Sequence, residues 1–393
     1  MQRPDHHWLD AERVTVYPRI LVTLFGLAAL AYAATLRDLV DFRGKPFGAD
    51  FITFWAASYL GLSGRAVEAY HVSAIGVAER VAVPAADSVF AWFYPPPFFL
   101  AILPLALMPY LVALVAFVGT TLTGYLLVLG RVLRRRDAAW LVAAFPGLWV
   151  CLAHGQTGFL TAALAGGALT VLRRRPLMAG LLIGLLAAFK PQLALLFPIA
   201  LIAAGSWAAL GMAALVMIGA FGVSVAVLGL PTLFAWLDSL KVARIALEVG
   251  ALPLVKSPTT FAAARLLGAP VEVAYVLHGF VALAAAAAVW LVWRSVAPDP
   301  IKAAVLMTAT FLATPYAFDY DLVWLVFPIA WLALAGMAEG WRRWDREVML
   351  ATYLVPVVAT VLAGLTRVQV APLVLGLACW VLLGRTRPAA DAR

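Results

Sequence analysis

The sequence predicts an all-α integral membrane protein that crosses the bilayer many times. Of its 393 residues, 64% are hydrophobic and only 12% are charged, and the mean hydropathy is +0.95. A soluble domain is nearer half apolar and one quarter charged. The apolar segments recur along the whole chain, so we expect one polytopic membrane domain over residues 1–393 rather than a soluble domain with a single anchor.

The apolar segments divide into about twelve predicted transmembrane helices. Several are shorter than the ~20 residues that a full crossing needs, so they require local thinning of the bilayer or burial among neighbouring helices. The predicted spans are 18–36, 109–131, 138–153, 157–172, 177–190, 191–205, 207–229, 271–294, 301–316, 321–338, 348–365 and 369–384. The apolar segment 94–108 is only about half a span long, and we place it as a helix at the outer surface. No cleavable signal peptide is expected, because the first apolar run lacks a small-residue cleavage site.

Basic residues set the expected orientation. Arginine clusters occupy the short turns at 131–136, 173–175, 341–346 and 385–387, which marks these turns as cytoplasmic. On this topology the inside segments contain 18 Lys+Arg and 9 Asp+Glu, whereas the outside segments contain 11 of each. Both termini therefore lie inside. The excess charge faces the membrane surface in short turns, which argues against a nucleic-acid partner and for membrane lipids.

Two long outer loops remain, at 37–93 and 230–270. Connections of this length in a compact protein are usually functional or disordered. The first loop contains aromatic-rich, amphipathic stretches such as "DFITFWAASYLGL", which favour helices lying in the membrane interface. Asp50 would then begin an interfacial helix on the outer face. The alternative for Asp50 is a helix N-cap with no chemical role.

Lys190 is a cation in a tight outer turn, where the basic-inside pattern disfavours it. It ends one short span, and Pro191 begins the next. A cation at membrane depth is costly and usually has a partner. Lys190 either binds a phosphate or extends its charged end to the surface as an ordinary helix-end lysine.

Other polar side chains fall in outer turns, and each has an ordinary alternative. His154 and Gln156 could simply cap helix ends. In the turn with Tyr316, Asp319, Tyr320 and Asp321, the two acids could form ion pairs with Lys190 or Arg367. Lys256 and Arg265 could anchor the second loop in the interface. If functional, Lys256 and Arg265 would contact an anionic headgroup or diphosphate.

One acid and several cations at the outer surface suit chemistry on a lipid-linked anionic donor. A sugar on a lipid phosphate already has a good leaving group, which needs positive charge rather than a proton donor. Only the acceptor hydroxyl needs a base, so one carboxylate suffices, unlike the acid–base pair of glycoside hydrolysis. Asp50 fits the base, and Lys190 fits the phosphate contact. We expect no metal and no other cofactor.

Five stretches in order resemble glycosyltransferase family 87, a branch of the polytopic GT-C superfamily. They are "GADFITFWAASYL", "YPPPFFLAILPLALMP", "GQTGFLTAALAGGAL", "AGLLIGLLAAFKPQLALLFP" and "TPYAFDYDLVWL", and the likeness covers roughly residues 20–365. Each motif is loose alone, but the five in this order are fairly specific. Members include polyprenyl-phosphate-mannose-dependent α-mannosyltransferases.

The resemblance implies a GT-C-type bundle of about 12 transmembrane helices that transfers a hexose, such as mannose, with inversion. The donor would be a polyprenyl-phosphate-linked sugar and the acceptor a lipid or glycan, at the periplasmic side of a bacterial inner membrane. Asp50 matches the general base of the superfamily. Lys190 and the segment that begins at Tyr94 match positions near the donor, and Tyr316 and Tyr320 join His154, Gln156 and Asp319 as substrate-binding candidates.

Two departures from the family pattern leave the sugar and the acceptor open. Relatives often have a histidine in the outer turn where this chain has "YAFDYD", and the resemblance leaves open whether Asp319 takes the place of that histidine. Many also have Asn-Gln-Ser where this chain has "SPT" at 257–259. The alternative class is a transporter or a flippase for lipid-linked sugars, but such proteins place ionisable residues near the middle of the membrane and often repeat in halves.

Overall fold

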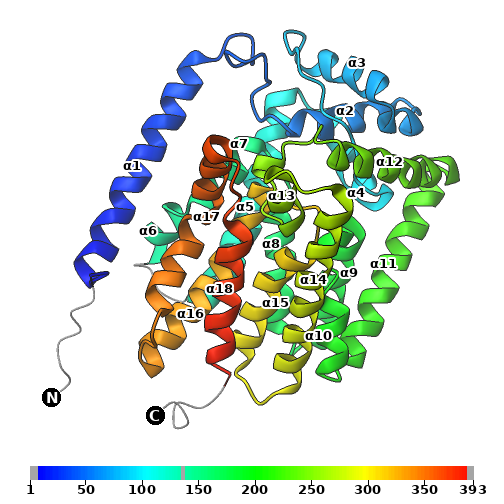
Figure 1. Cartoon of the computed structure of the whole chain (residues 1–393). Helices are drawn as coiled ribbons and strands as arrows, with labels where there is room; N and C mark the ends of the chain where they lie inside the picture. Colours follow the sequence, from blue (N-terminus) through cyan, green and yellow to red (C-terminus); the bar gives the residue numbers. More distant parts are fainter. Residues whose placement is uncertain (1–7, 134–137, 387–393) are drawn as a thin grey trace.

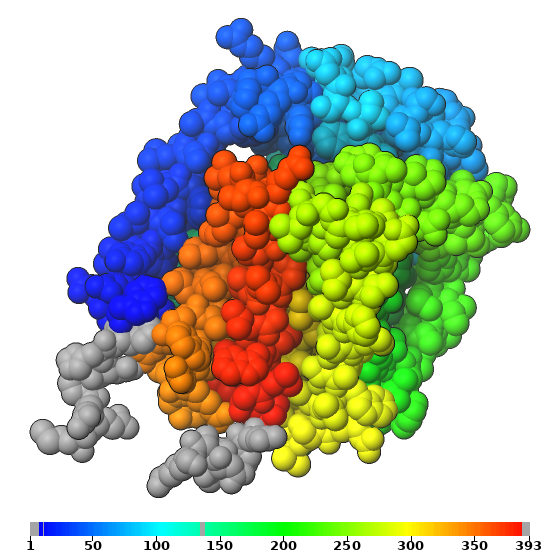
Figure 2. Space-filling model, in the orientation of Figure 1, coloured from blue at the N-terminus to red at the C-terminus, as the bar shows by residue number. Residues whose placement is uncertain are grey.

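The computed structural model describes residues 8–133 and 138–386, and these residues form an all-helical bundle without strands. Figure 1 shows long helices running side by side, with α1 standing at one side of the bundle. Shorter helices gather at one end. Figure 2 shows the segment between α1 and about residue 100, in lighter blue to cyan, covering that end of the molecule.

Within the described residues, six helical stretches are long and apolar enough to cross a membrane. The helices that contain them are α1 (Ala11–Thr35), α5 (Tyr110–Leu133), α11 (Trp207–Leu228), α14 (Val271–Arg294), α16 (Val326–Glu339) with the 3₁₀ helix η5 (Asp319–Leu325) before it, and α17 (Asp345–Thr366). The sequence therefore correctly predicted an all-α protein of membrane composition.

The other predicted spans are helical but short. They are α6 (Ala138–Ala143) with α7 (Pro146–His154), α8 (Gly158–Val171), α9 (Pro176–Phe189), the 3₁₀ helix η3 (Pro191–Leu193) with α10 (Phe197–Ala203), α15 (Asp299–Ala313) and α18 (Ala371–Gly384). Proline occupies the first turn of α7, α9, α10, α15 and α18, where its missing N–H costs nothing. The total of twelve crossings stays a prediction.

The first outer loop is helical, as its amphipathic pattern predicts. It contains α2 (Phe51–Leu62), the 3₁₀ helix η1 (Ala66–Tyr70) and α3 (Val72–Ala82). The segment after it forms α4 (Pro96–Ile102) and the 3₁₀ helix η2 (Leu103–Leu107), too short to cross a bilayer. Their burial at a membrane surface stays a prediction.

An aromatic core joins the first loop to the bundle. The ring of Phe54 contacts those of Trp92, Phe98 and Phe117 at centroid distances of 6.0, 5.5 and 5.4 Å. All four side chains are buried. Edge-to-face rings at these distances pack favourably, so the start of α2 is held firmly against α5.

The second outer loop contains α12 (Leu230–Glu248), the 3₁₀ helix η4 (Leu254–Lys256) and α13 (Thr260–Leu266). Thr259 caps α13 by accepting a hydrogen bond from the amide of Ala262. Figure 1 shows α12 lying across the same end of the bundle as α2 and α3. Both long loops therefore contribute to one surface.

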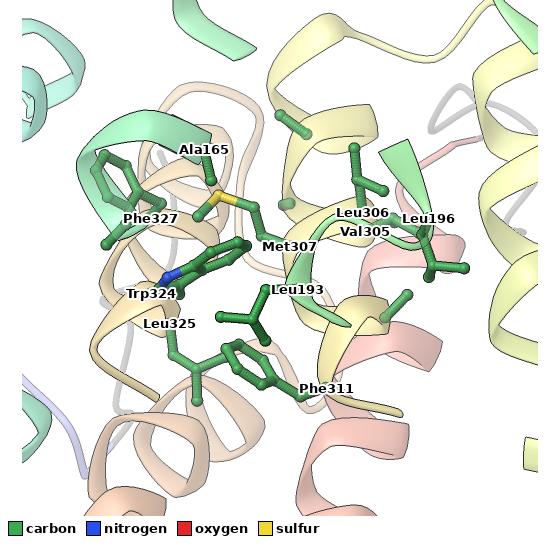
Figure 3. Close-up of a cluster of buried hydrophobic side chains, with 14 of the residues drawn as sticks. Ala165, Leu193, Leu196, Val305, Leu306, Met307, Phe311, Trp324, Leu325 and Phe327 are labelled. Atoms are coloured by element: carbon green, nitrogen blue, oxygen red, sulfur yellow. The ribbon is translucent and has the colours of Figure 1, made fainter. Parts of the chain in front are cut away.

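A second core anchors the turn that contains Asp319 and Asp321. The buried Trp324 packs near Leu193, Met307 and Phe311 in Figure 3, and its indole N–H donates to Thr161 Oγ1 at 3.0 Å. Because Trp324 belongs to η5, its burial fixes the polar residues at the start of that 3₁₀ helix.

Candidate active site

Asp50 lies in the first outer loop, immediately before α2. The two residues before it, Gly48 and Ala49, both have positive φ angles. Its carboxylate makes no capping hydrogen bond, so the N-cap alternative is wrong. Instead, Asp50 Oδ2 accepts a hydrogen bond from Gln156 Nε2 at 3.0 Å.

Gln156 is held in a single orientation by three neighbours. Its Oε1 accepts from the hydroxyl of Tyr94 at 2.7 Å and from the amide of Thr157 at 3.0 Å. An oxygen that accepts two donors leaves the amide nitrogen to face the acceptor, the carboxylate of Asp50. Burial raises the pKa of Tyr94 well above its ordinary value. The hydroxyl therefore stays neutral and donates.

Gly155 allows this approach. Its φ of 58° is left-handed, and a Cβ there would lie 2.8 Å from Phe51 Cβ and 3.0 Å from the carbonyl oxygen of Gly48. A side chain would therefore push the turn after α7 away from the start of α2. The glycine in "HGQTG" brings Gln156 to Asp50.

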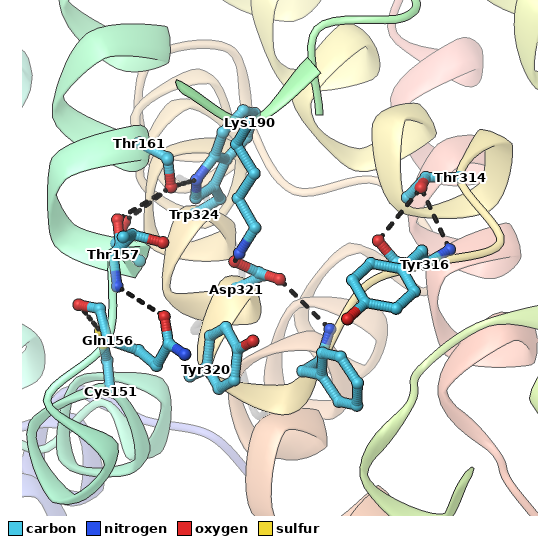
Figure 4. Close-up of polar contacts among 12 residues, drawn as sticks. Cys151, Gln156, Thr157, Thr161, Lys190, Thr314, Tyr316, Tyr320, Asp321 and Trp324 are labelled. Carbon is cyan, nitrogen blue, oxygen red and sulfur yellow. Dashed lines mark hydrogen bonds and ion pairs between the residues drawn. The ribbon is translucent and has the colours of Figure 1, made fainter. Parts of the chain in front are cut away.

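Lys190 and Asp321 form a buried ion pair. Lys190 Nζ lies 2.7 Å from Asp321 Oδ1, and the two side chains are 4% and 0% exposed. The other oxygen of Asp321 accepts from the amide of Phe318 at 3.2 Å. Figure 4 shows Lys190 reaching down to Asp321 beside the ring of Tyr320. The ion-pair alternative for these acids is confirmed for Lys190, while phosphate binding by this lysine stays a prediction.

His154 and Lys256 form a second polar pair. Lys256 Nζ lies 2.8 Å from His154 Nε2, and His154 Nδ1 lies 2.8 Å from the carbonyl oxygen of Val150. A carbonyl only accepts, so the ring proton belongs on Nδ1, and Nε2 accepts from the ammonium. No carboxylate forms an ion pair with Lys256 in the part of the chain that the structure describes, so its charge is the less neutralised of the two lysines.

Asp319 neighbours this pair and lies close enough to Lys256 to interact with its charge. It is 4% exposed. Its oxygens accept from the amide of Tyr320 at 2.9 Å and from the hydroxyl of Thr360 at 3.3 Å. The second polar pair thus has an acidic neighbour, but no direct hydrogen bond to it is formed in the described chain.

The ring of Tyr320 lies near both polar pairs, Lys190–Asp321 and His154–Lys256. Lys190 Nζ lies 4.9 Å from the centroid of its ring, a cation–π distance, and the imidazole of His154 lies 5.7 Å from it on the same measure. Tyr316 stands nearby, within reach of the charges of Lys190 and Asp50. The structure therefore brings together nine of the ten predicted site residues.

Arg265 is the predicted residue that the structure sets apart. Its guanidinium donates to the carbonyl oxygens of Ala269 at 2.7 Å and Glu248 at 2.9 Å. These bonds join the ends of α12 and α13. These contacts hold the second loop together, while anchoring in the membrane interface and phosphate binding by Arg265 both stay predictions.

Sequence reasoning missed Glu79 of α3. The carboxyl is 1% exposed, and both of its oxygens accept from the amide of Phe90, at 3.2 and 3.1 Å. Burial raises the pKa of Glu79 to about 8, and the negative charge of Asp50 adds to the effect, while Arg80 opposes it. In the sequence an arginine follows this acid, and no local pattern marks it as buried.

Glu79 makes stability depend on pH. Its pKa rises from 4.5 to about 8 on folding, so its stabilising contribution is complete below pH 4.5 and is lost as the pH approaches 8. We expect the free energy of unfolding in detergent to fall by about 3–4 kcal/mol between pH 5 and 8. Glu79→Gln cannot titrate and should flatten the profile. An equal slope in both proteins would contradict this role.

The fold and the site define a class: a polytopic membrane protein with a half-buried carboxylate, Asp50, that is hydrogen-bonded to Gln156, and with lysines at the same end. The sequence model of Glycosyltransferase family 87 matches residues 92–315. This is more than half of the chain, and the protein belongs to that family as a membrane glycosyltransferase. The matched region contains Tyr94, Gln156, Lys190 and Lys256, whereas Asp50 precedes it. Neither the curated proteins nor the solved structures gave a match.

Proposed function

We propose that this glycosyltransferase moves a hexose, mannose or a similar sugar, from a polyprenyl phosphate to a lipid or glycan acceptor. Transfer takes place with inversion at the periplasmic face of a bacterial inner membrane. The observation that carries the proposal is the position of Asp50. It is a carboxylate whose hydrogen-bond partner, Gln156, neither titrates nor neutralises it, and lysines lie in neighbouring turns.

The reaction requires one proton acceptor. The acceptor hydroxyl attacks C1 of the sugar, its proton passes to Asp50, and the bond between C1 and the phosphate oxygen breaks with its electron pair leaving on the phosphate. An ordinary carboxylate is a weak base, but a hydroxyl becomes acidic as its oxygen bonds to C1. Gln156 holds Asp50 in place without adding charge.

The leaving phosphate requires positive charge. Lys256 supports this role best, because its ammonium contacts a neutral imidazole rather than a carboxylate. Lys190 is paired with Asp321, so most of its positive charge is neutralised. It therefore stabilises a phosphate less than Lys256 does. A charge-assisted hydrogen bond to the phosphate strengthens as the bond to C1 breaks.

Lys256→Met should weaken donor binding while the protein still folds. Loss of one charge-assisted hydrogen bond of about 1.5–3 kcal/mol predicts a rise in the KM for donor of about 10–100-fold. Transfer kinetics with purified protein measure it. The control is Lys241→Met, which removes an exposed lysine of the same outer loop. An unchanged KM in Lys256→Met would place the phosphate elsewhere.

The proposed function is tested by offering the protein different sugar donors in liposomes. A panel of radiolabelled polyprenyl-phospho-hexoses and -pentoses is compared with the matching nucleotide sugars, with membrane lipid extract as acceptor. Transfer from a polyprenyl-phosphate hexose is expected. Transfer from nucleotide sugars alone would contradict the proposal. Movement of the labelled lipid across the bilayer without sugar transfer would instead support the flippase alternative.

A further inference from the structure

Glu79 is a buried acid that the proposed chemistry does not use. Among the described residues its carboxyl forms hydrogen bonds only with the amide of Phe90, and the adjacent Arg80 is exposed. Burying a carboxyl without a cation is costly unless hydrogen bonds compensate. The hydrogen bond from the Phe90 amide therefore compensates this burial, and it ties α3 to the segment that contains Phe90.

That segment, residues 88–95, has no regular secondary structure. Side chains from three helices bind its backbone instead. Glu79 of α3 accepts from the Phe90 amide, Trp236 of α12 donates to the carbonyl oxygen of Phe93 at 3.2 Å, and Tyr70 of η1 donates to that of Tyr94 at 2.9 Å. A segment without its own hydrogen-bond ladder takes its position from such contacts.

The position of this segment decides where the hydroxyl of Tyr94 lies. That hydroxyl donates to Gln156 Oε1 at 2.7 Å, and Gln156 in turn donates to Asp50 at 3.0 Å. A shift of the segment along its own axis would withdraw the hydroxyl and release Gln156 to rotate. The chain of contacts therefore runs from Glu79 through Phe90, Tyr94 and Gln156 to Asp50.

We propose that Glu79 is a positioning residue for the Asp50 site, which it orients by fixing the segment that presents Tyr94 to Gln156. The inference rests on the proposed function only where it concerns sugar transfer. Burial keeps the Glu79 carboxyl largely protonated at neutral pH, so it orients this segment without placing a second negative charge beside Asp50. Glutamine reproduces the neutral carboxyl in size and in acceptor oxygen.

The test compares Glu79→Gln with Glu79→Met, which keeps the length of the side chain but removes the acceptor. Hydrogen exchange followed by mass spectrometry reports on residues 88–95. Loss of one hydrogen bond should speed exchange of this segment about tenfold in Glu79→Met and leave Glu79→Gln near wild type. Glu79→Asp, whose carboxyl falls one methylene short, makes the same comparison if the methionine variant does not fold. The control is Glu68→Gln, an exposed acid of the same loop.

Sugar transfer tests the second half of the inference. Glu79→Met should lower kcat about tenfold with little change in the KM for donor, and Tyr94→Phe should add little to that loss in the double variant. Losses in kcat that add up in the double variant would overturn the inference. So would a Glu79→Met protein whose kcat falls while hydrogen exchange at 88–95 stays normal. If the segment loosens but wild type transfers no sugar from any donor, the proposed function fails while the anchoring of the segment stands.

Discussion

Replacing Asp50 with asparagine is expected to lower the rate of sugar transfer by about 10²–10⁴-fold, the usual contribution of a general base. Asparagine has the same shape, and its amide oxygen still accepts a hydrogen bond from Gln156 Nε2, now 3.0 Å from Asp50 Oδ2. It cannot accept the proton of the acceptor hydroxyl at neutral pH. The loss should therefore fall on kcat, with the donor KM nearly unchanged, as measured by steady-state transfer from the preferred donor.

Asp38→Asn is the matched control for this experiment. Asp38 is an exposed acid of the same outer loop with a φ of 51°, a conformation that asparagine tolerates well. It removes the same charge from the same surface and should leave the rate within a factor of two or so. Equal transfer by wild type and Asp50→Asn would remove Asp50 from the chemistry.

Lys190→Met is expected to destabilise the protein by about 3–5 kcal/mol, because it leaves the carboxylate of Asp321 buried and unpaired. The side chains of this pair are 4% and 0% exposed, and 2.7 Å separates the charged atoms. Asp321→Leu should cost a similar amount for the opposite reason. Denaturant unfolding in detergent measures both losses.

The double variant Lys190→Met/Asp321→Leu should recover most of that stability, because a buried ion pair replaced by apolar side chains is often neutral. The pair Asp238–Lys241 supplies the control, since its side chains are 72% and 76% exposed and its removal should have little effect. If Lys190→Met is as stable as wild type yet transfers no sugar, the lysine serves the substrate rather than Asp321.

The helical architecture was predictable because it depends on local composition. Uninterrupted apolar runs bounded by arginine clusters or proline indicate helices whatever their neighbours are. The break between α6 and α7 ends at Pro146, the first residue of α7, and this proline marks it in the sequence. How many of the short helices cross the bilayer depends on neighbours that bury them, so composition alone does not decide it.

Part of the site was predictable because the outer turns lie at the same end of the bundle, so their polar side chains come together. Asp50, Gln156 and Lys190 were identified in this way. The choice of partner was not predictable, because either acid of this turn could pair with Lys190 or Arg367. Only the packing of η5, which its buried Trp324 fixes, directs Asp321 to Lys190. Glu79 escaped notice because its burial depends on the segment around Phe90, eleven residues away.

The central claim is a single displacement at C1 with Asp50 as the base, and the anomeric configuration of the product tests it most directly. The product of purified wild-type protein is isolated, and the one-bond carbon–proton coupling at C1 is compared with that of the donor. Inversion is the result that a single carboxylate base predicts. Retention would require a covalent intermediate or a second carboxylate in the reaction, and would contradict this account.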